Sequence, residues 1–162
     1  MNREDILKEA QECLNCKNPL CRKGCPMQTR IPDFISQIKN GNLEEAYRIL
    51  QENNIMSDIT SNVCPYEEYC SGHCVKGIKG KPVQIYKLEK YVNLWARENN
   101  IKYEYNVEKS NDIKVAVIGS GPAGIECAVE LVKKGYKVTI FEKEEQIGGL
   151  LTYGIPGFRL PR

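Results

Sequence analysis

The fold is decided by residues 114–124, which read KVAVIGSGPAG. The apolar run 114–118 is typical of a buried strand, and three glycines follow it with the spacing Gly-x-Gly-x-x-Gly. In such a turn Gly119 allows the tight bend, Gly121 lets the backbone approach a pyrophosphate, and Gly124 lets helix and strand pack closely. We therefore expect a dinucleotide phosphate to bind at this turn, which consists of Gly119, Ser120, Gly121, Pro122, Ala123 and Gly124.

The residues after the turn complete the pattern of a β-α-β unit. A helical segment ends at Gly135, and a second apolar run over residues 138–141 leads to Glu142, whose carboxylate can accept the ribose hydroxyls of an adenosine. Cys127 falls within this helical segment, and we expect it to be a small core residue. Strand, turn, helix, strand and acid predict the first β-α-β unit of a Rossmann-type domain, but they do not separate FAD from NAD.

The segment before the strand separates two domains. Residues 98–112 lose the apolar period, so we expect a boundary near Ser110. An α-helical domain would occupy residues 1–110, and the α/β Rossmann-type domain residues 111–162. In the first domain, apolar spacing and helix-start signals predict helices over residues 3–14, 32–39, 42–50 and 83–97.

Cysteine is concentrated in the first domain. Seven of the eight cysteines lie in the runs Cys13-x2-Cys16-x4-Cys21-x3-Cys25-Pro26 and Cys64-Pro65-x4-Cys70-x3-Cys74. A disulfide framework needs an oxidising compartment, whereas in a reducing compartment this density indicates metal. The spacings differ from those of zinc sites, in which two close pairs converge on one ion. Cubane iron–sulfur clusters take four ligands each, and ferredoxin-like runs send the last cysteine, often followed by proline, to a second cluster.

The ligand count for two cubanes leaves one position open. On the ferredoxin logic, Cys13, Cys16 and Cys21 hold one cluster, Cys25 crosses to a second, and the downstream three cysteines complete both. Seven thiolates then leave one vacancy. His73 is the only histidine, and we expect a supporting or exposed role for it. A zinc site and unmetallated thiols are the alternatives.

Residues 13–98 resemble the N-terminal iron–sulfur domain shared by the glutamate synthase small subunit and dihydropyrimidine dehydrogenase, including IYKLEKYV over residues 85–92. In that family the second of two 4Fe-4S clusters takes three cysteines and a side-chain oxygen from a following helix. For one cluster the resemblance implies Cys13, Cys16, Cys21 and Cys74. For the other it implies Cys25, Cys64, Cys70 and Glu89. Spacing alone favours a different interpretation, in which Glu89 is a solvated helix residue paired with Lys87 or Lys90.

Residues 142–161 resemble the flavin-binding continuation of the same family, with a double glycine at 148–149 and the ending FRLP. Adjacent glycines allow the backbone to lie against a large flat cofactor, and an arginine offers a forked donor for a phosphate or carbonyl. The resemblance implies that FAD is contacted by Glu142, Lys143, Gly149, Leu150 and Arg159.

The resemblance also implies a function in electron transfer. The intact family protein is an NADPH-dependent oxidoreductase in which FAD accepts a hydride and the clusters pass single electrons to a partner, which in glutamate synthase is the large subunit. No residue is expected to act as a catalytic acid or base. The same front end resembles pyrimidine-reducing and electron-bifurcating oxidoreductases. A docking function without turnover, with clusters or zinc, is a further alternative.

Composition argues against two other classes of partner. The chain has 23 Lys and Arg against 21 Asp and Glu, and no long basic run is interleaved with aromatics, so nucleic acid is not expected. No apolar run approaches the roughly 20 residues of a membrane span, and no signal peptide is apparent, so we expect a cytoplasmic protein without a membrane partner. Because a Rossmann-type sheet needs several strands and no NADPH-binding domain is present, we expect an incomplete, N-terminal fragment that is inactive alone.

Overall fold

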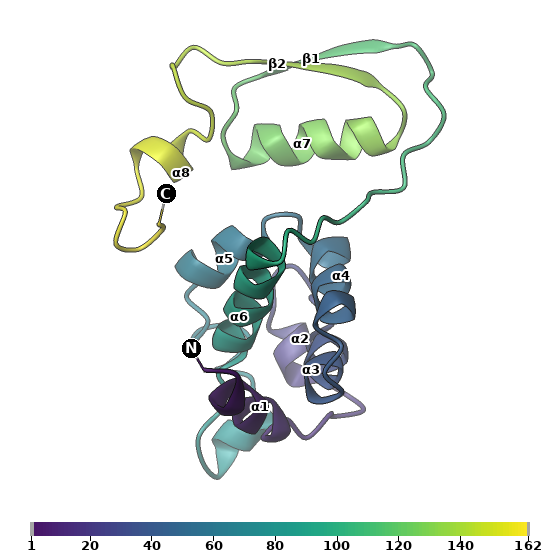
Figure 1. Cartoon of the computed structure of the whole chain (residues 1–162). Helices are drawn as coiled ribbons and strands as arrows, with labels where there is room; N and C mark the ends of the chain where they lie inside the picture. The colour runs from purple at the N-terminus through teal and green to yellow at the C-terminus, as the bar shows by residue number, and fades with distance from the viewer. Residues whose placement is uncertain (1, 162) are drawn as a thin grey trace. The chain divides into compact units, whose positions relative to one another are not determined.

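The computed structural model describes residues 2–161 and divides into two compact units, Met1–Tyr103 and Glu104–Arg162. The first unit is helical, and the second contains a parallel pair of strands (Figure 1). Among the described residues, no helix has the length and hydropathy that crossing a lipid bilayer requires.

The first unit is built from short helices with cysteine-bearing loops between them (Figure 1). Its elements are α1 (Arg3–Gln11), α2 (Leu20–Lys23), α3 (Ile31–Lys39), α4 (Leu43–Asn53), α5 (Ser57–Val63), the 3-10 helix η1 (Val75–Ile78) and α6 (Ile85–Glu98). Helix α6 packs against α1, α4 and α5, while α3 packs against α1 and α4. The longest helix of this unit, α6, therefore forms the centre around which the others assemble.

The core of this unit lies along the apolar faces of α3 and α6. Phe34 and Ile35 of α3 are fully buried, as are Leu88 and Val92 of α6. Full burial of one such side chain contributes about 1.5–3 kcal/mol, so these stripes dominate the stability of the unit. The helices predicted from apolar spacing all form, but the first ends at Gln11, and Leu14 lies beyond it with 64% of its surface exposed.

The second unit consists of one β-α-β unit and one additional short helix. Strand β1 (Lys114–Ile118) leads through the glycine-rich turn into α7 (Pro122–Lys133) and then into β2 (Lys137–Phe141), which is parallel to β1. The register pairs Lys114 with Lys137 and Ile118 with Phe141. Helix α8 (Leu150–Tyr153) follows. A parallel pair joined by a helix is the repeating element of Rossmann-type sheets.

Residues 104–113 belong to the second unit. The backbone N–H of Glu108 donates to the carbonyl oxygen of Lys133, and that of Asn111 donates to the carbonyl oxygen of Gly135. The ammonium of Lys133 also lies 4.8 Å from the ring centroid of Tyr105. Because of these contacts the division between compact units falls after Tyr103, ahead of the boundary expected near Ser110.

Cys127 does not occupy the position expected of it. Helix α7 buries Ala128, and Cys127 is exposed. Successive helix residues point about 100° apart, so the neighbour of a buried residue readily faces away from the sheet. The expectation of a core cysteine is therefore wrong.

Candidate functional site

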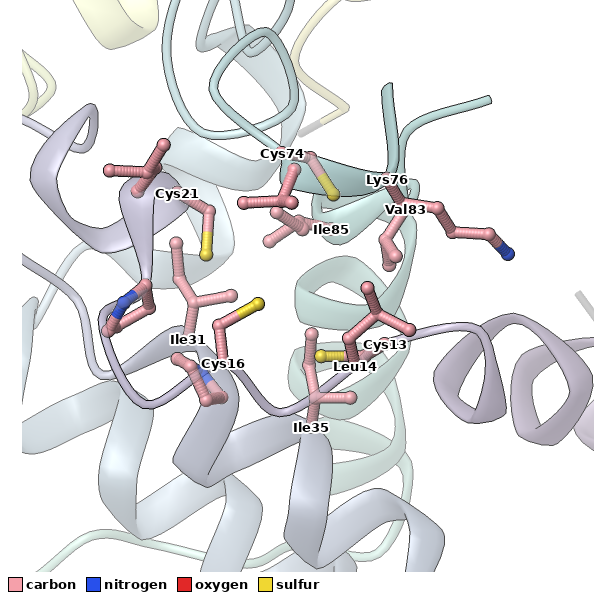
Figure 2. Close-up of a pocket in the computed structure, with 14 residues that line it drawn as sticks. Cys13, Leu14, Cys16, Cys21, Ile31, Ile35, Cys74, Lys76, Val83 and Ile85 are labelled. Carbon is pink, nitrogen blue, oxygen red and sulfur yellow. The ribbon is translucent and has the colours of Figure 1, made fainter. Parts of the chain in front are cut away.

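Four cysteines from distant parts of the first unit line one pocket. Cys13 and Cys16 lie in the loop after α1, Cys21 lies in α2, and Cys74 immediately precedes η1. Figure 2 shows their sulfur atoms turned toward a common space. We call this space the first pocket. The structure thus brings together the four cysteines that the resemblance assigns to one cluster.

The wall of the first pocket is largely apolar. Ile31 and Ile35 of α3 and Val83 and Ile85 before and at the start of α6 contribute to it. Lys76 also borders the pocket, but its amine extends away from the sulfurs in Figure 2 and forms an ion pair with Glu12. An apolar wall limits solvent access to a bound metal, which is one of the ways a protein sets a cluster potential.

The thiols of the first pocket act on one another. Burial raises the pKa of Cys21 to about 11; the backbone N–H of Arg22 lowers it, and Cys74, Cys13 and Cys16 raise it further. A thiol with so high a pKa is protonated at neutral pH when it has no cation beside it. A coordinating metal would supply such a charge and deprotonate the thiol outright, so metal binding in this pocket would release protons.

A second pocket contains the remaining predicted ligands. It has a volume of about 340 Å³, and its walls include Cys25, Cys64, Cys70 and Glu89. Tyr66 and Tyr86 also line it and stack with ring centroids 3.7 Å apart. We call this space the second pocket. Cys25 follows α2 and Cys64 follows α5, so two loops and α6 meet here.

The second pocket has its own electrostatic partners. Burial raises the pKa of Cys70 to about 12, and Glu89, Cys25 and Cys64 raise it further, against a smaller lowering by Ser71. Burial, Glu89 and Cys25 likewise raise the pKa of Cys64. None of these neighbours belongs to the first pocket. The seven cysteines of the helical unit therefore separate into a group of four thiols and a group of three thiols with one carboxyl.

Glu89 lies in the wall of the second pocket rather than on a solvated helix face. Burial raises the pKa of its carboxyl to about 7, and a hydrogen bond from Ser57 lowers it. The Ser57 hydroxyl donates to Oε1 of Glu89 over 2.9 Å. The surface interpretation, with Lys87 or Lys90 as ion-pair partner, does not fit this environment.

All eight cysteines are free thiols in the structure. Among residues 2–161, no group of three or more His, Cys, Asp or Glu side chains converges closely enough to hold a single metal ion. Ligands of a cubane bind its separate corners and stand farther apart than the ligands of one tetrahedral ion. His73 is exposed, and its Nδ1 donates to the carbonyl oxygen of Tyr69 over 2.7 Å.

The glycines of the turn in the second unit have distinct surroundings. Gly119 has a φ of +94°, which favours glycine. A Cβ on Gly124 would lie 2.0 Å from the carbonyl oxygen of Gly119, whereas a Cβ on Gly121 would meet nothing within 4 Å. Gly124 is thus required for packing, and Gly121 leaves open space at the N-terminus of α7. Pro122 and Ala123 form the first turn of that helix.

Glu142 is held beside the same turn. Its carboxylate accepts hydrogen bonds from the backbone N–H and the hydroxyl of Ser120, and from the backbone N–H groups of Lys143 and Glu144. These bonds, led by that of the Ser120 hydroxyl, hold the pKa of Glu142 at about 2. The carboxylate is therefore ionised at neutral pH and fixed next to the phosphate-binding turn.

The segment after Glu142 returns to the turn through its double glycine. The backbone N–H of Gly148 donates to the carbonyl oxygen of Ser120 over 3.0 Å. A Cβ on Gly149 would lie 3.0 Å from the Cα of Gly121, so the two backbones are in close contact. The other predicted cofactor contacts have exposed side chains: Lys143, Leu150 and Arg159.

Sequence reasoning missed Ser57 and Asn93, which surround Glu89. Ser57 begins α5 and Asn93 lies one turn after Glu89 on α6. Both are buried. Nothing in the sequence distinguishes them from other small polar residues, because Ser57 reaches Glu89 only through the packing of α5 on α6.

A helical unit with two cysteine-lined pockets, followed by a β-α-β unit with a glycine-rich turn, is typical of iron–sulfur oxidoreductases that bind a dinucleotide. Residues 1–101 match the family model described as dihydropyrimidine dehydrogenase domain II, 4Fe-4S cluster. The chain belongs to this family, as the sequence resemblance predicted. Residues 117–161 match a second model, described as an NAD(P)-binding Rossmann-like domain.

Relatives with curated names are similar over nearly the whole chain. The small chain of glutamate synthase (NADPH) from Escherichia coli (strain K12) is 36% identical over 154 residues, which cover 95% of this chain and 33% of that protein. The small chain from Azospirillum brasilense is 38% identical, over 96% of this chain and 32% of that protein. PreT, a subunit of NAD-dependent dihydropyrimidine dehydrogenase from Salmonella typhimurium, is 38% identical, with coverages of 96% and 38%. The chain spans about a third of the length of these relatives.

Proposed function

We propose that this chain is the electron-transfer portion of an NADPH-dependent oxidoreductase that conducts electrons between FAD and two 4Fe-4S clusters toward a partner subunit. The observation that carries the proposal is the separation of eight donor side chains into two pockets of four. Four donors are what one cubane requires. The family match over residues 1–101 supports the same chemistry.

The first cluster would be held by the thiolates of Cys13, Cys16, Cys21 and Cys74. The second would be held by the thiolates of Cys25, Cys64 and Cys70 together with the carboxylate of Glu89. Bound clusters would supply one-electron transfer. The residues themselves fit this role, because four partly buried thiols line the first pocket, three thiols and the Glu89 carboxyl line the second, and no thiol is consumed in a disulfide.

The second unit would bind FAD through its adenosine and pyrophosphate. Gly121 leaves space at the N-terminus of α7, where backbone amides and the helix dipole favour a phosphate. Glu142 is an ionised acceptor beside it for the ribose hydroxyls. The match to an NAD(P)-binding model supports a dinucleotide. The preference for FAD rests on the resemblance of residues 142–161 to a flavin-binding continuation.

The partner would be a large subunit of the glutamate synthase type or a pyrimidine-reducing subunit. Sequence identity is 36–38% to glutamate synthase small chains and 38% to PreT, so the two kinds of partner subunit have equal support. Cytoplasmic location belongs to the same proposal, since cluster ligands must stay reduced. On its own, this chain would not oxidise NADPH.

Metal analysis of anaerobically purified protein tests the proposal. We expect about eight iron atoms and as many labile sulfides per chain. Stoichiometric zinc without iron would contradict it. In a protein that also carries a complete FAD domain and an NADPH-binding domain, NADPH should reduce an artificial dye with flavin dependence. Mixing each partner subunit with the loaded protein, and measuring glutamate or dihydropyrimidine formation, separates the two partners.

A further inference from the structure

Three polar side chains form a relay behind the second pocket. The Nδ2 group of Asn93 donates to the hydroxyl oxygen of Ser57 over 2.8 Å, and the Ser57 hydroxyl donates to Oε1 of Glu89 over 2.9 Å. Ser57 is completely buried, and Asn93 has 3% of its surface exposed. Polar groups so deeply buried are costly unless their hydrogen bonds are made, so the relay is a fixed part of the structure.

The direction of the relay follows from its donors. Nδ2 of Asn93 also donates to the carbonyl oxygen of Glu89 over 3.1 Å, which fixes the orientation of the amide because Oδ1 in that place would face another acceptor. Since Asn93 donates to Ser57, the single hydroxyl proton of Ser57 is directed at Glu89. Among the described residues, Oδ1 of Asn93 is buried without a hydrogen-bond partner. The orientation of the amide therefore satisfies its Nδ2 group and leaves Oδ1 without a partner.

The relay connects two elements of the second pocket. Ser57 is the first residue of α5, and Cys64 directly follows the last residue of that helix. Glu89 and Asn93 share one face of α6, which packs against α5. One short helix thus carries a thiol of the second pocket at one end and the hydrogen-bond donor to its carboxyl at the other. The hydrogen bond from Ser57 uses Oε1 of Glu89.

We propose that Ser57, oriented by Asn93, is a positioning residue that holds Oε1 of Glu89 and presents Oε2 to the metal of the second pocket. The inference rests on the proposed function, in which Glu89 is a cluster ligand. Partners that hydrogen-bond to a ligating carboxylate orient it, and their loss typically weakens metal binding 10–100-fold. A donor to the ligand also withdraws electron density, so it makes the bound cluster easier to reduce.

The test compares Ser57→Ala with Ser36→Ala in the cluster-loaded chain. Ser36 is a half-buried serine of α3 that lines neither pocket. In Ser57→Ala we expect iron of the second cluster to pass to a chelator at least about tenfold faster. Its midpoint potential should fall, because the hydroxyl that withdraws electron density from Glu89 is gone. The first cluster and both clusters of the Ser36→Ala protein should be unchanged.

A second pair of variants tests the same inference if the Ser57→Ala protein does not fold. Ser57→Thr keeps the hydroxyl, and the valine of Ser57→Val has nearly the same shape as that threonine but no hydroxyl. The difference in potential and release rate between these two variants therefore reports the hydrogen bond alone. Asn93→Leu should shift the same potential in the same direction. Equal potentials and release rates in the Thr and Val proteins, or equal shifts of both clusters, would overturn the inference. If Glu89→Ala, introduced without a change at Ser57, leaves the second cluster unaffected, the proposed ligand set itself is wrong.

Discussion

Substituting one cysteine from each pocket is the sharpest test of the two-site arrangement. Cys21 lines the first pocket and Cys70 lines the second, and the neighbours that raise the pKa of each thiol belong to its own pocket. A serine hydroxyl is a poor replacement for a soft thiolate ligand of iron. We therefore expect Cys21→Ser and Cys70→Ser each to lose one cluster and to keep the other.

The magnitude follows from the separation of the pockets. Two cubanes hold about eight iron atoms, so each single variant should keep roughly four. Cys16→Ser combined with Cys21→Ser removes two ligands of one site and should again leave roughly four. Cys21→Ser combined with Cys70→Ser should leave none. The losses of iron should add when the two cysteines lie in different pockets and should not add when they lie in the same pocket, as expected of independent and shared sites.

The assay is anaerobic determination of iron and sulfide, with electron paramagnetic resonance of the reduced protein to identify the surviving cluster. Cys127→Ser is the matched control, because Cys127 is exposed in the second unit and should leave all iron in place. Loss of all iron in Cys21→Ser, with the helical fold retained in circular dichroism, would refute the assignment of separate sites. Equal spectra for the Cys21→Ser and Cys70→Ser proteins would refute it as well.

Three further predictions concern individual residues. Glu89→Cys should retain a second cluster with a changed midpoint potential, whereas Glu89→Ala should make that cluster labile; unchanged iron content and potential in both would show that Glu89 is not a ligand. Gly124→Ala should destabilise the second unit by about 1–3 kcal/mol in thermal unfolding, because its Cβ would meet a carbonyl oxygen at 2.0 Å. Gly121→Ala should change unfolding by less than about 0.5 kcal/mol, since its Cβ has open space, and should weaken FAD binding in the longer protein; equal unfolding of the two variants would contradict this. Ser120→Ala should raise the pKa of Glu142 from about 2 toward 4.5. A carboxyl whose pKa is lower in the folded than in the unfolded protein stabilises the fold at pH values above its unfolded-state pKa, and this stabilisation is lost as the pH falls through its folded-state pKa. The Ser120→Ala protein should therefore unfold at a higher pH than the wild-type protein in an acid titration. An identical acid transition would count against the hydrogen bond.

Local pattern was sufficient to predict the β-α-β unit. The apolar run and the glycines before α7 specify strand, turn and helix within 20 or so neighbouring residues, and β1 begins and ends where the run does. The expectation that this strand is buried is wrong, because only Val117 of β1 is buried. The same holds for α3 and α6, whose apolar stripes became the core of the helical unit. In these elements each residue's role depends on neighbours a few positions away.

The grouping of the cysteines depends on contacts that spacing does not contain. Cys74 shares a pocket with Cys13, although Cys70, only four positions earlier, shares one with Cys25. Spacing predicted that Cys25 leaves the group of Cys13, Cys16 and Cys21, but only the family resemblance divided the three downstream thiols between the two sites. Exposure of Cys127 and the relay from Asn93 through Ser57 were beyond reach for the same reason, because each depends on which helix face packs against another element.

The two cysteine loops must cross for both sites to form, and Gly24 lies at the crossing. It precedes Cys25 and contacts His73, which precedes Cys74, so the loops touch next to one residue of each pocket. A Cβ on Gly24 would lie 2.5 Å from Nδ1 of His73, and that ring is fixed by its hydrogen bond to Tyr69. A larger residue at position 24 would require the His73 ring to move and its hydrogen bond to Tyr69 to change. Because each loop contributes cysteines to both pockets, neither proposed site can be assembled without the other loop in place, and we expect formation of the two sites to be coupled to folding of the helical unit.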